Sequence, residues 1–169
     1  ILVEPEGGLP KVDDEFYVMQ SELYTTGAFG VHGRQEESVQ KLLAEQPEYF
    51  VFNGAVGALT KDHPMQVRTG DKVRIFFGVG GPNYTSSFHM IGEIFDRVQQ
   101  WGSVSNPPLA DVQTVSVPPG GAAIAELVPE VPGRYIMVDH ALSRLERGLV
   151  GFMFAAGKDQ PDIYREGTD

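Results

Sequence analysis

The sequence contains no cysteine among its 169 residues. This absence excludes disulfide bonds, zinc–thiolate and iron–sulfur sites, thiol nucleophiles and a blue-copper centre built within this chain alone, because each of them requires cysteine sulfur. It assigns no cellular compartment, since a protein without cysteine can work in both reducing and oxidising surroundings.

Basic residues and long apolar runs are also scarce. The chain has 13 Lys and Arg against 23 Asp and Glu, which gives a formal net charge of −10. The basic residues are scattered, and this argues against nucleic-acid binding, because neutralising phosphates requires clustered Lys and Arg. No apolar run approaches the ~20 residues that a membrane-spanning helix needs. At about 150 residues per domain, the length allows one domain or one domain with a long arm.

Short apolar runs separated by Gly and Pro make up most of the chain. Residues 15–24, which are rich in aromatic and β-branched side chains, predict a strand. Residues 36–45 predict the one helix, with acidic residues in its first turn and Pro47 ending it. Further strands are predicted at residues 49–52, 65–68, 72–79, 87–98, 112–117, 122–128, 134–138 and 149–155. This pattern predicts an all-β fold, a Greek-key β-sandwich with one short helix and extended termini.

Several motifs have structural explanations. Residues 78–83 are similar to a phosphate-binding loop, but the Lys-Ser/Thr ending is missing and no helix is expected after them, so they predict a turn. Residues 83–85 match a glycosylation sequon by spelling alone. Glu93 and Asp96 are the candidates for a pair of catalytic carboxylates, and a solvated strand face is the favoured alternative.

The four histidines differ in their surroundings. His32 and His63 lie beside Gly and Pro, which predicts solvated loop positions. His89 lies inside an apolar run whose alternation places it opposite Phe88, and His140 closes another such run. A hydrogen-bonded structural role is the commoner alternative for both. Two histidines cannot complete a metal site, so a metal here would need ligands from another chain or domain.

Two stretches resemble cupredoxin domains. Residues 67–75, followed by the strand that carries His89, resemble the middle of such a domain. Residues 132–140 with residues 148–151 resemble its last strands and ligand loop. In blue-copper cupredoxins that loop supplies Cys, His and Met, and here Asp139 matches the Cys position and Leu149 the Met position. Without the thiolate the blue site cannot form.

The chain more specifically resembles the second domain of copper-containing nitrite reductases. The resemblance rests on residues 51–60, 87–93, 119–123 and 138–141 and extends from about Val12 to about Ala155. It implies three segments: the last strand of a first domain plus a linker at residues 1–11, a second cupredoxin-like domain at 12–156 and a C-terminal arm at 157–169. The remainder of the first domain is absent from this chain.

The same resemblance implies site residues. In the family the active site lies between the first domain of one subunit and the second domain of its neighbour in a homotrimer. His140 matches the one His ligand that the second domain gives to the catalytic (type 2) copper, His89 the His that relays protons, and Ile91 an apolar residue that restricts how nitrite binds. Gln113 and Thr114 fall where partners orienting the relay His are found. The type 1 copper and the other ligands belong to the first domain.

The implied activity is the periplasmic one-electron reduction of nitrite to nitric oxide, with copper as cofactor and a small cupredoxin or cytochrome c as electron donor. The net charge of −10 offers no long-range attraction for an anionic substrate. A metal-free cupredoxin-like scaffold without activity is the alternative. The last domain of a laccase-like oxidase is disfavoured, because its His-Cys-His cluster is absent.

Overall fold

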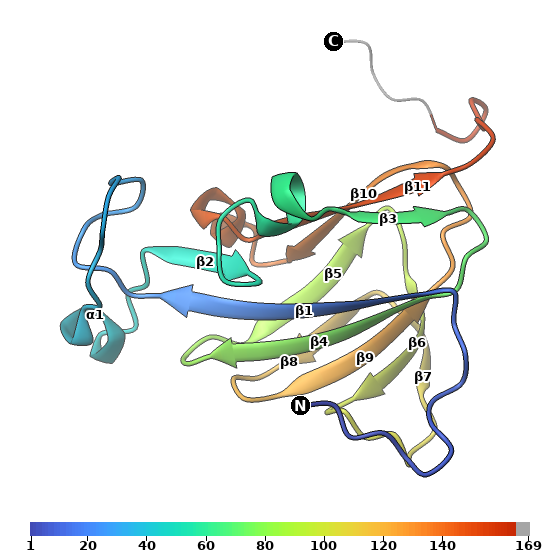
Figure 1. Cartoon of the computed structure of the whole chain (residues 1–169), viewed down its shortest axis with the longest axis horizontal. Helices are drawn as coiled ribbons and strands as arrows, with labels where there is room; N and C mark the ends of the chain where they lie inside the picture. The colour runs from blue at the N-terminus through green and yellow to red at the C-terminus, as the bar shows by residue number, and fades with distance from the viewer. Residues whose placement is uncertain (165–169) are drawn as a thin grey trace.

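Two β-sheets packed face to face form the chain in the computed structural model, which describes residues 1–164 (Figure 1). The first sheet contains, in spatial order, β2 (Tyr49–Phe52), β1 (Asp14–Leu23), β4 (Val73–Gly81), β9 (Ala122–Leu127), β6 (Phe95–Gln100) and β7 (Leu109–Val112). The second contains β3 (Met65–Arg68), β11 (Val150–Ala156), β10 (Gly133–Asp139), β5 (Ser86–Ile91) and β8 (Thr114–Val117). The predicted all-β Greek-key sandwich is confirmed.

Strand pairing is mixed. β1 pairs with β4 and β3 with β11 in parallel, whereas β5 runs antiparallel to both of its neighbours, β10 and β8. β5 is therefore an interior strand whose backbone is hydrogen-bonded on both sides, and interior strands of this kind hold their side chains in a defined register.

Three stacked phenylalanines join the two sheets. The ring of Phe88 on β5 lies 3.9 Å, centroid to centroid, from that of Phe77 on β4 and 5.3 Å from that of Phe95 on β6. All three rings are buried. Because Phe88 points into the core, its chain neighbours on β5 face away from it.

Two predicted strands are each two strands in the structure. Residues 87–98 form β5 and β6, which belong to different sheets, and Gly92 turns the chain between them with a φ of 100°. Residues 112–117 contain the end of β7 and all of β8, again in different sheets, with Gln113 between them. The prediction of single strands was wrong because the apolar pattern continues across both turns while the burial switches from one sheet to the other.

The helix is shorter than predicted. α1 (Val39–Leu43) begins after Ser38, whose side chain accepts a hydrogen bond from the Lys41 N–H, so the acidic residues at 36 and 37 precede the helix instead of occupying its first turn. Figure 1 shows α1 and the loop before it projecting beyond the ends of β1 and β2. None of its five residues is buried. The apolar side chains that predicted this helix therefore do not pack into the core.

Two short helical segments were not predicted: the π-helix η1 (Ala58–Asp62) and the 3-10 helix η2 (Leu142–Arg147). η2 begins two residues after β10, beyond His140 and Ala141, and is followed by Gly148, which has a φ of 106°. Within residues 1–164, no helix has the length and hydrophobicity that a membrane span requires.

Within residues 1–164, the segments before β1 and after β11 carry no strand. Residues 1–13 contain no strand pairing within the described chain, and their assignment to a preceding domain stays a prediction. The predicted C-terminal arm begins after β11 and includes a turn at residues 161–163, while residues 165–169 lie outside the described part of the chain.

Candidate functional site

His89 and His140 lie side by side on the outer side of the second sheet. The register pairs Val138 of β10 with His89 of β5, and His140 is the first residue after β10. Their ring centroids are 5.2 Å apart. The His140 backbone N–H also donates to the carbonyl oxygen of Ser87 at 2.8 Å, so β5 continues to restrain the chain beyond the end of β10.

The ring of His89 is held in one tautomer. Its Nδ1 lies 2.6 Å from the carbonyl oxygen of Gln113 and 3.4 Å from the Thr114 hydroxyl. Because a carbonyl oxygen can only accept, Nδ1 carries the proton and donates it to Gln113. Nε2 is then the ring atom that can gain and lose a proton. Both contacts follow from the register, which pairs Thr114 of β8 with His89.

Ile91 lies two residues beyond His89 on the same face of β5, and its side chain is 39% exposed. The predicted alternation of β5 is confirmed, because Phe88 and Met90 are fully buried on the opposite face. The site therefore presents two imidazoles and one aliphatic side chain on the outer face of the second sheet.

A hollow of about 350 Å³ adjoins His89 and is lined also by Gly92, Glu93, Ile94 and Gln113. Burial raises the pKa of Glu93 above its ordinary value, and the negative charges of Asp96 and Glu130 raise it further. Of the two carboxylates predicted as a candidate pair, Glu93 lies half-buried in the turn between β5 and β6, and Asp96 is exposed on β6. Glu93 is thus the acid that borders the site.

Asp139, at the position that resembles the cupredoxin cysteine, is a buried carboxylate with several partners. Its side chain accepts hydrogen bonds from the backbone N–H groups of Ser87 and Ala141 and from the Gln20 amide, each at 3.1 Å, and forms an ion pair with Arg144. The predicted Met-like position, Leu149, is fully buried. A guanidinium and a carboxylate thus meet where a blue-copper site would require a thiolate.

Arg144 was missed at the level of sequence. A signal for it exists, because an aspartate at the buried end of an apolar strand needs a counter-charge, and Arg144 is the first basic residue after Asp139. Pattern alone could not show that the two side chains meet, since the backbone turn of η2 brings them together.

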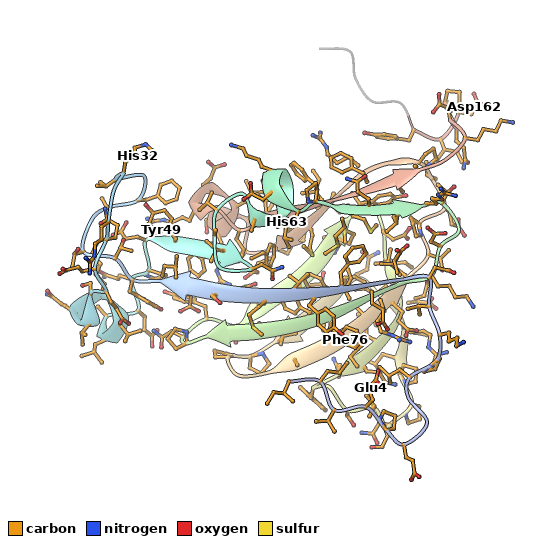
Figure 2. All side chains as sticks on the ribbon, viewed as in Figure 1. Glu4, His32, Tyr49, His63, Phe76 and Asp162 are labelled. Atoms are coloured by element: carbon orange, nitrogen blue, oxygen red, sulfur yellow. The ribbon has the colours of Figure 1, made fainter. Side chains whose placement is uncertain are left out.

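The described residues of this chain can supply one ligand of a metal site, His140. His140 is exposed and offers an imidazole nitrogen, a common metal ligand. Residues 1–164 contain no group of three or more His, Cys, Asp or Glu side chains placed to hold a metal. His32, on the loop before α1, and His63, after η1, lie on separate surface segments (Figure 2).

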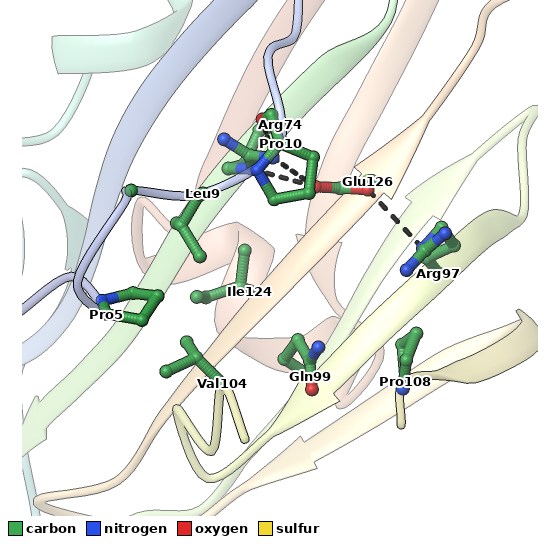
Figure 3. A pocket seen from close by; sticks show the side chains of 11 residues that line it. Pro5, Leu9, Pro10, Arg74, Arg97, Gln99, Val104, Pro108, Ile124 and Glu126 are labelled. Carbon is green, nitrogen blue, oxygen red and sulfur yellow. Dashed lines mark hydrogen bonds and ion pairs between the residues drawn. The ribbon is translucent and has the colours of Figure 1, made fainter. Parts of the chain in front are cut away.

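A second hollow, of about 270 Å³, lies against the outer face of the first sheet (Figure 3). Arg74, 2% exposed, forms ion pairs there with Glu15 and Glu126 and donates to the carbonyl oxygen of Pro10 at 2.6 Å. Its charge is already compensated by two carboxylates. This cluster therefore holds the N-terminal segment against the sheet and offers no site for an anion.

Comparison with a protein-family model and with known sequences gives copper proteins in each case. The model of the multicopper oxidase family matches residues 32–157. The copper-containing nitrite reductase of Neisseria meningitidis serogroup A is 47% identical over 165 residues, which cover 96% of this chain and 42% of that protein. That of Alcaligenes faecalis is 32% identical over 153 residues, 89% of this chain and 40% of that protein. The chain thus spans less than half the length of these curated relatives.

A solved structure agrees in fold. The copper nitrite reductase of Nitrosomonas europaea superposes with a TM-score of 0.76 at 28% sequence identity, covering 91% of this chain and 53% of that one. A multicopper oxidase structure superposes with a TM-score of 0.71 at 23% identity, a likeness that concerns the fold alone.

Proposed function

Because this chain belongs to the multicopper oxidase family and is homologous to copper-containing nitrite reductases over 96% of its length, we propose that it supplies the second cupredoxin domain of an enzyme that reduces nitrite to nitric oxide. In this proposal His140 is one ligand of the type 2 copper and His89 relays protons. The observation that carries it is the adjacency of the two imidazoles, 5.2 Å apart, with Nδ1 of His89 tied to Gln113.

The reaction consumes one electron and two protons for each nitrite and yields nitric oxide and water. Copper held by imidazoles, with a vacant position for an oxyanion, supplies the one-electron redox chemistry when bound. His140 would contribute one of these imidazoles, and by family resemblance the remaining ligands would come from the first domain of a neighbouring subunit; residues 1–164 themselves gather no group of three ligands.

His89 acts as the proton relay. The hydrogen bond from Nδ1 to the Gln113 carbonyl holds the ring in one orientation, and the Thr114 hydroxyl lies beside the same atom. Nε2 then takes up a proton from solvent and releases it to nitrite. Imidazole suits this role because it exchanges protons near neutral pH.

Ile91 acts by shape. Its partly exposed side chain stands on the same face of β5 as His89 and limits the orientations open to a bound anion. Replacing Ile91 with a smaller residue changes how nitrite binds more than how much copper is bound, because it removes volume and no ligand atom.

The surface next to the histidines is where we expect a partner domain to bind. On the outer face of the second sheet, Ile91 is paired with Ile136 on β10, and Ile136 is paired in turn with Phe152 on β11, so that these three residues form an apolar surface on the face that carries His89. We assign this surface to the first cupredoxin domain of a neighbouring subunit in a homotrimer. The electron donor is a small cupredoxin or cytochrome c, and the location is the periplasm, both by family resemblance.

Two substitutions in the intact protein, with its first domain present, test these roles. His140→Ala is expected to lose the type 2 copper, measured by metal analysis, because a ligand is removed. His89→Ala is expected to keep copper and to lower nitrite turnover by roughly 10²–10⁴-fold, the usual contribution of a positioned proton donor. His63→Ala, on a separate surface segment, serves as the matched control and should change neither quantity.

The outcomes separate the roles. Full copper loading without His140 contradicts the ligand assignment, and undiminished nitrite reduction without His89 contradicts the relay. If the intact protein binds no type 2 copper at all, the chain is a metal-free scaffold.

A further inference from the structure

We propose that the buried ion pair between Asp139 and Arg144 is the positioning device for His140 and sets its separation from His89. The inference rests on the proposed function only for the identity of what His140 binds. Asp139 lies directly before His140, and it is 1% exposed, so its side chain is closed to solvent. It can act on the site only through the backbone that it holds.

One oxygen of Asp139 is bonded to both segments that carry a histidine. Oδ1 accepts from the backbone N–H of Ser87, two residues before His89, and from that of Ala141, immediately after His140. The N–H of His140 in turn donates to the carbonyl oxygen of Ser87. A single carboxylate oxygen therefore links the start of β5 to the chain that leaves β10.

The other oxygen joins this carboxylate to Arg144. Oδ2 accepts from the Gln20 amide on β1 and from the guanidinium, and Nη1 of Arg144 also donates to the carbonyl oxygen of Thr85 at 2.8 Å. The guanidinium lies over the rings of Phe50 and Tyr84, 5.1 Å and 4.9 Å from their centroids. Arg144 is thus held by β2 and by the residue that precedes β5, and it cannot move without disturbing Asp139.

This arrangement matters because His140 stands one residue beyond the last residue of β10, where strand pairing ends. A side chain at a frayed strand end samples many positions, and binding a metal would then require ordering it. The bonds to Asp139 order the backbone on both sides of the imidazole in advance, as the supporting groups of metal ligands commonly do.

A double substitution separates positioning from stability. Replacing a buried ion pair with apolar residues of similar volume is often neutral for stability, whereas removing one partner is costly. Asp139→Leu combined with Arg144→Met in the intact protein should therefore leave a folded protein that lacks the bonds to Ser87 and Ala141. Arg144→Lys keeps a positive charge beside Asp139 and should preserve most of the restraint on His140. Glu126→Gln, which disturbs the buried pair with Arg74 on the other sheet, is the matched control.

Two measurements test whether the Asp139–Arg144 pair positions His140. In the double variant, hydrogen exchange of the Ser87 and Ala141 amides should accelerate at least about tenfold, since both lose their acceptor. The dissociation constant of the copper bound by His140, from chelator competition, should rise by roughly 10–100-fold, the usual effect of losing a group that supports a ligand. The Glu126→Gln control should change neither value.

The alternatives are distinguishable. Unchanged exchange of both amides overturns the inference whether or not copper is bound. Faster exchange with unchanged copper affinity also overturns it, because the pair would then be structural only. A wild-type protein that binds no copper refutes the proposed function, and the exchange measurement still decides whether the pair restrains His140. If the double variant does not fold, Arg144→Lys and Arg144→Met are compared by the same two measurements.

Discussion

Replacing Phe88 with alanine tests how the core supports the site. Phe88 is fully buried on β5, stacked between Phe77 and Phe95, and it directly precedes His89. Its ring holds the inner face of β5 against the first sheet, and this contact keeps the histidine on the outer face. Truncation removes the middle ring of the stack and leaves a cavity between the two sheets.

The expected cost follows from burial. A fully buried phenylalanine replaced by alanine typically costs ~3–5 kcal/mol of the free energy of unfolding, through lost transfer energy and an unfilled cavity. Each aromatic pair contributes about 0.5–1.5 kcal/mol beyond buried area, and Phe88 belongs to two pairs. We therefore expect a loss near the upper end, about 4–5 kcal/mol.

Urea unfolding measures this loss from the midpoint and the m-value. Phe29→Ala is the matched control: Phe29 is 43% exposed and contacts one ring, that of Tyr49, so its removal should cost about 1 kcal/mol. A loss for Phe88→Ala no larger than that of the control, at an unchanged m-value, would refute the view that this stack joins the sheets.

Two further predictions concern Glu93, which lines the hollow beside His89, and Gly148, which follows η2. Burial raises the pKa of Glu93, so the folded state binds that proton more tightly than the unfolded state, and the carboxyl lowers stability as pH rises from the ordinary glutamate pKa through the raised value. The stability gain of Glu93→Gln, from urea unfolding at a series of pH values, should grow across that window; a pH-independent gain would contradict it. Gly148→Ala should cost about 1–3 kcal/mol, measured by thermal unfolding, because φ is 106° and the new Cβ would lie 2.5 Å from Val56. Gly120→Ala, with φ of 74° and open space, should cost less, and an equal cost would refute the clash.

Much of the fold could be predicted from short-range patterns. The runs at 49–52 and 65–68 have the bounds of β2 and β3. The first is rich in aromatic and β-branched residues, which favour extended backbone, and the second lies between Pro64 and the turn at Gly70. The alternation around His89 correctly placed Phe88 and Met90 inside and His89 and Ile91 outside, since strand side chains alternate between faces.

Other elements could not be predicted in this way. The turns at Gly92 and Gln113 interrupt apolar patterns that continue on both sides, and only the transfer of the chain between sheets reveals them. α1 has half of its predicted length because none of its apolar residues is buried in the core, and short helices depend on such packing.

The pattern of residues was enough for the β-sandwich and for the absence of a blue-copper thiolate, because strand propensity, side-chain alternation and residue identity are local properties. The site is not local. His89 meets His140, and Gln113 meets His89, only because β10 and β8 pair with opposite edges of β5 in one particular register. In the sequence, Asp139 only occupies the position of the missing cupredoxin cysteine. Its contacts with Ser87, Ala141 and Arg144, through which it supports His140, are seen only in the structure. Hydrogen-bonded pairing and burial act between segments far apart in the chain, so these contacts exist only in the folded molecule.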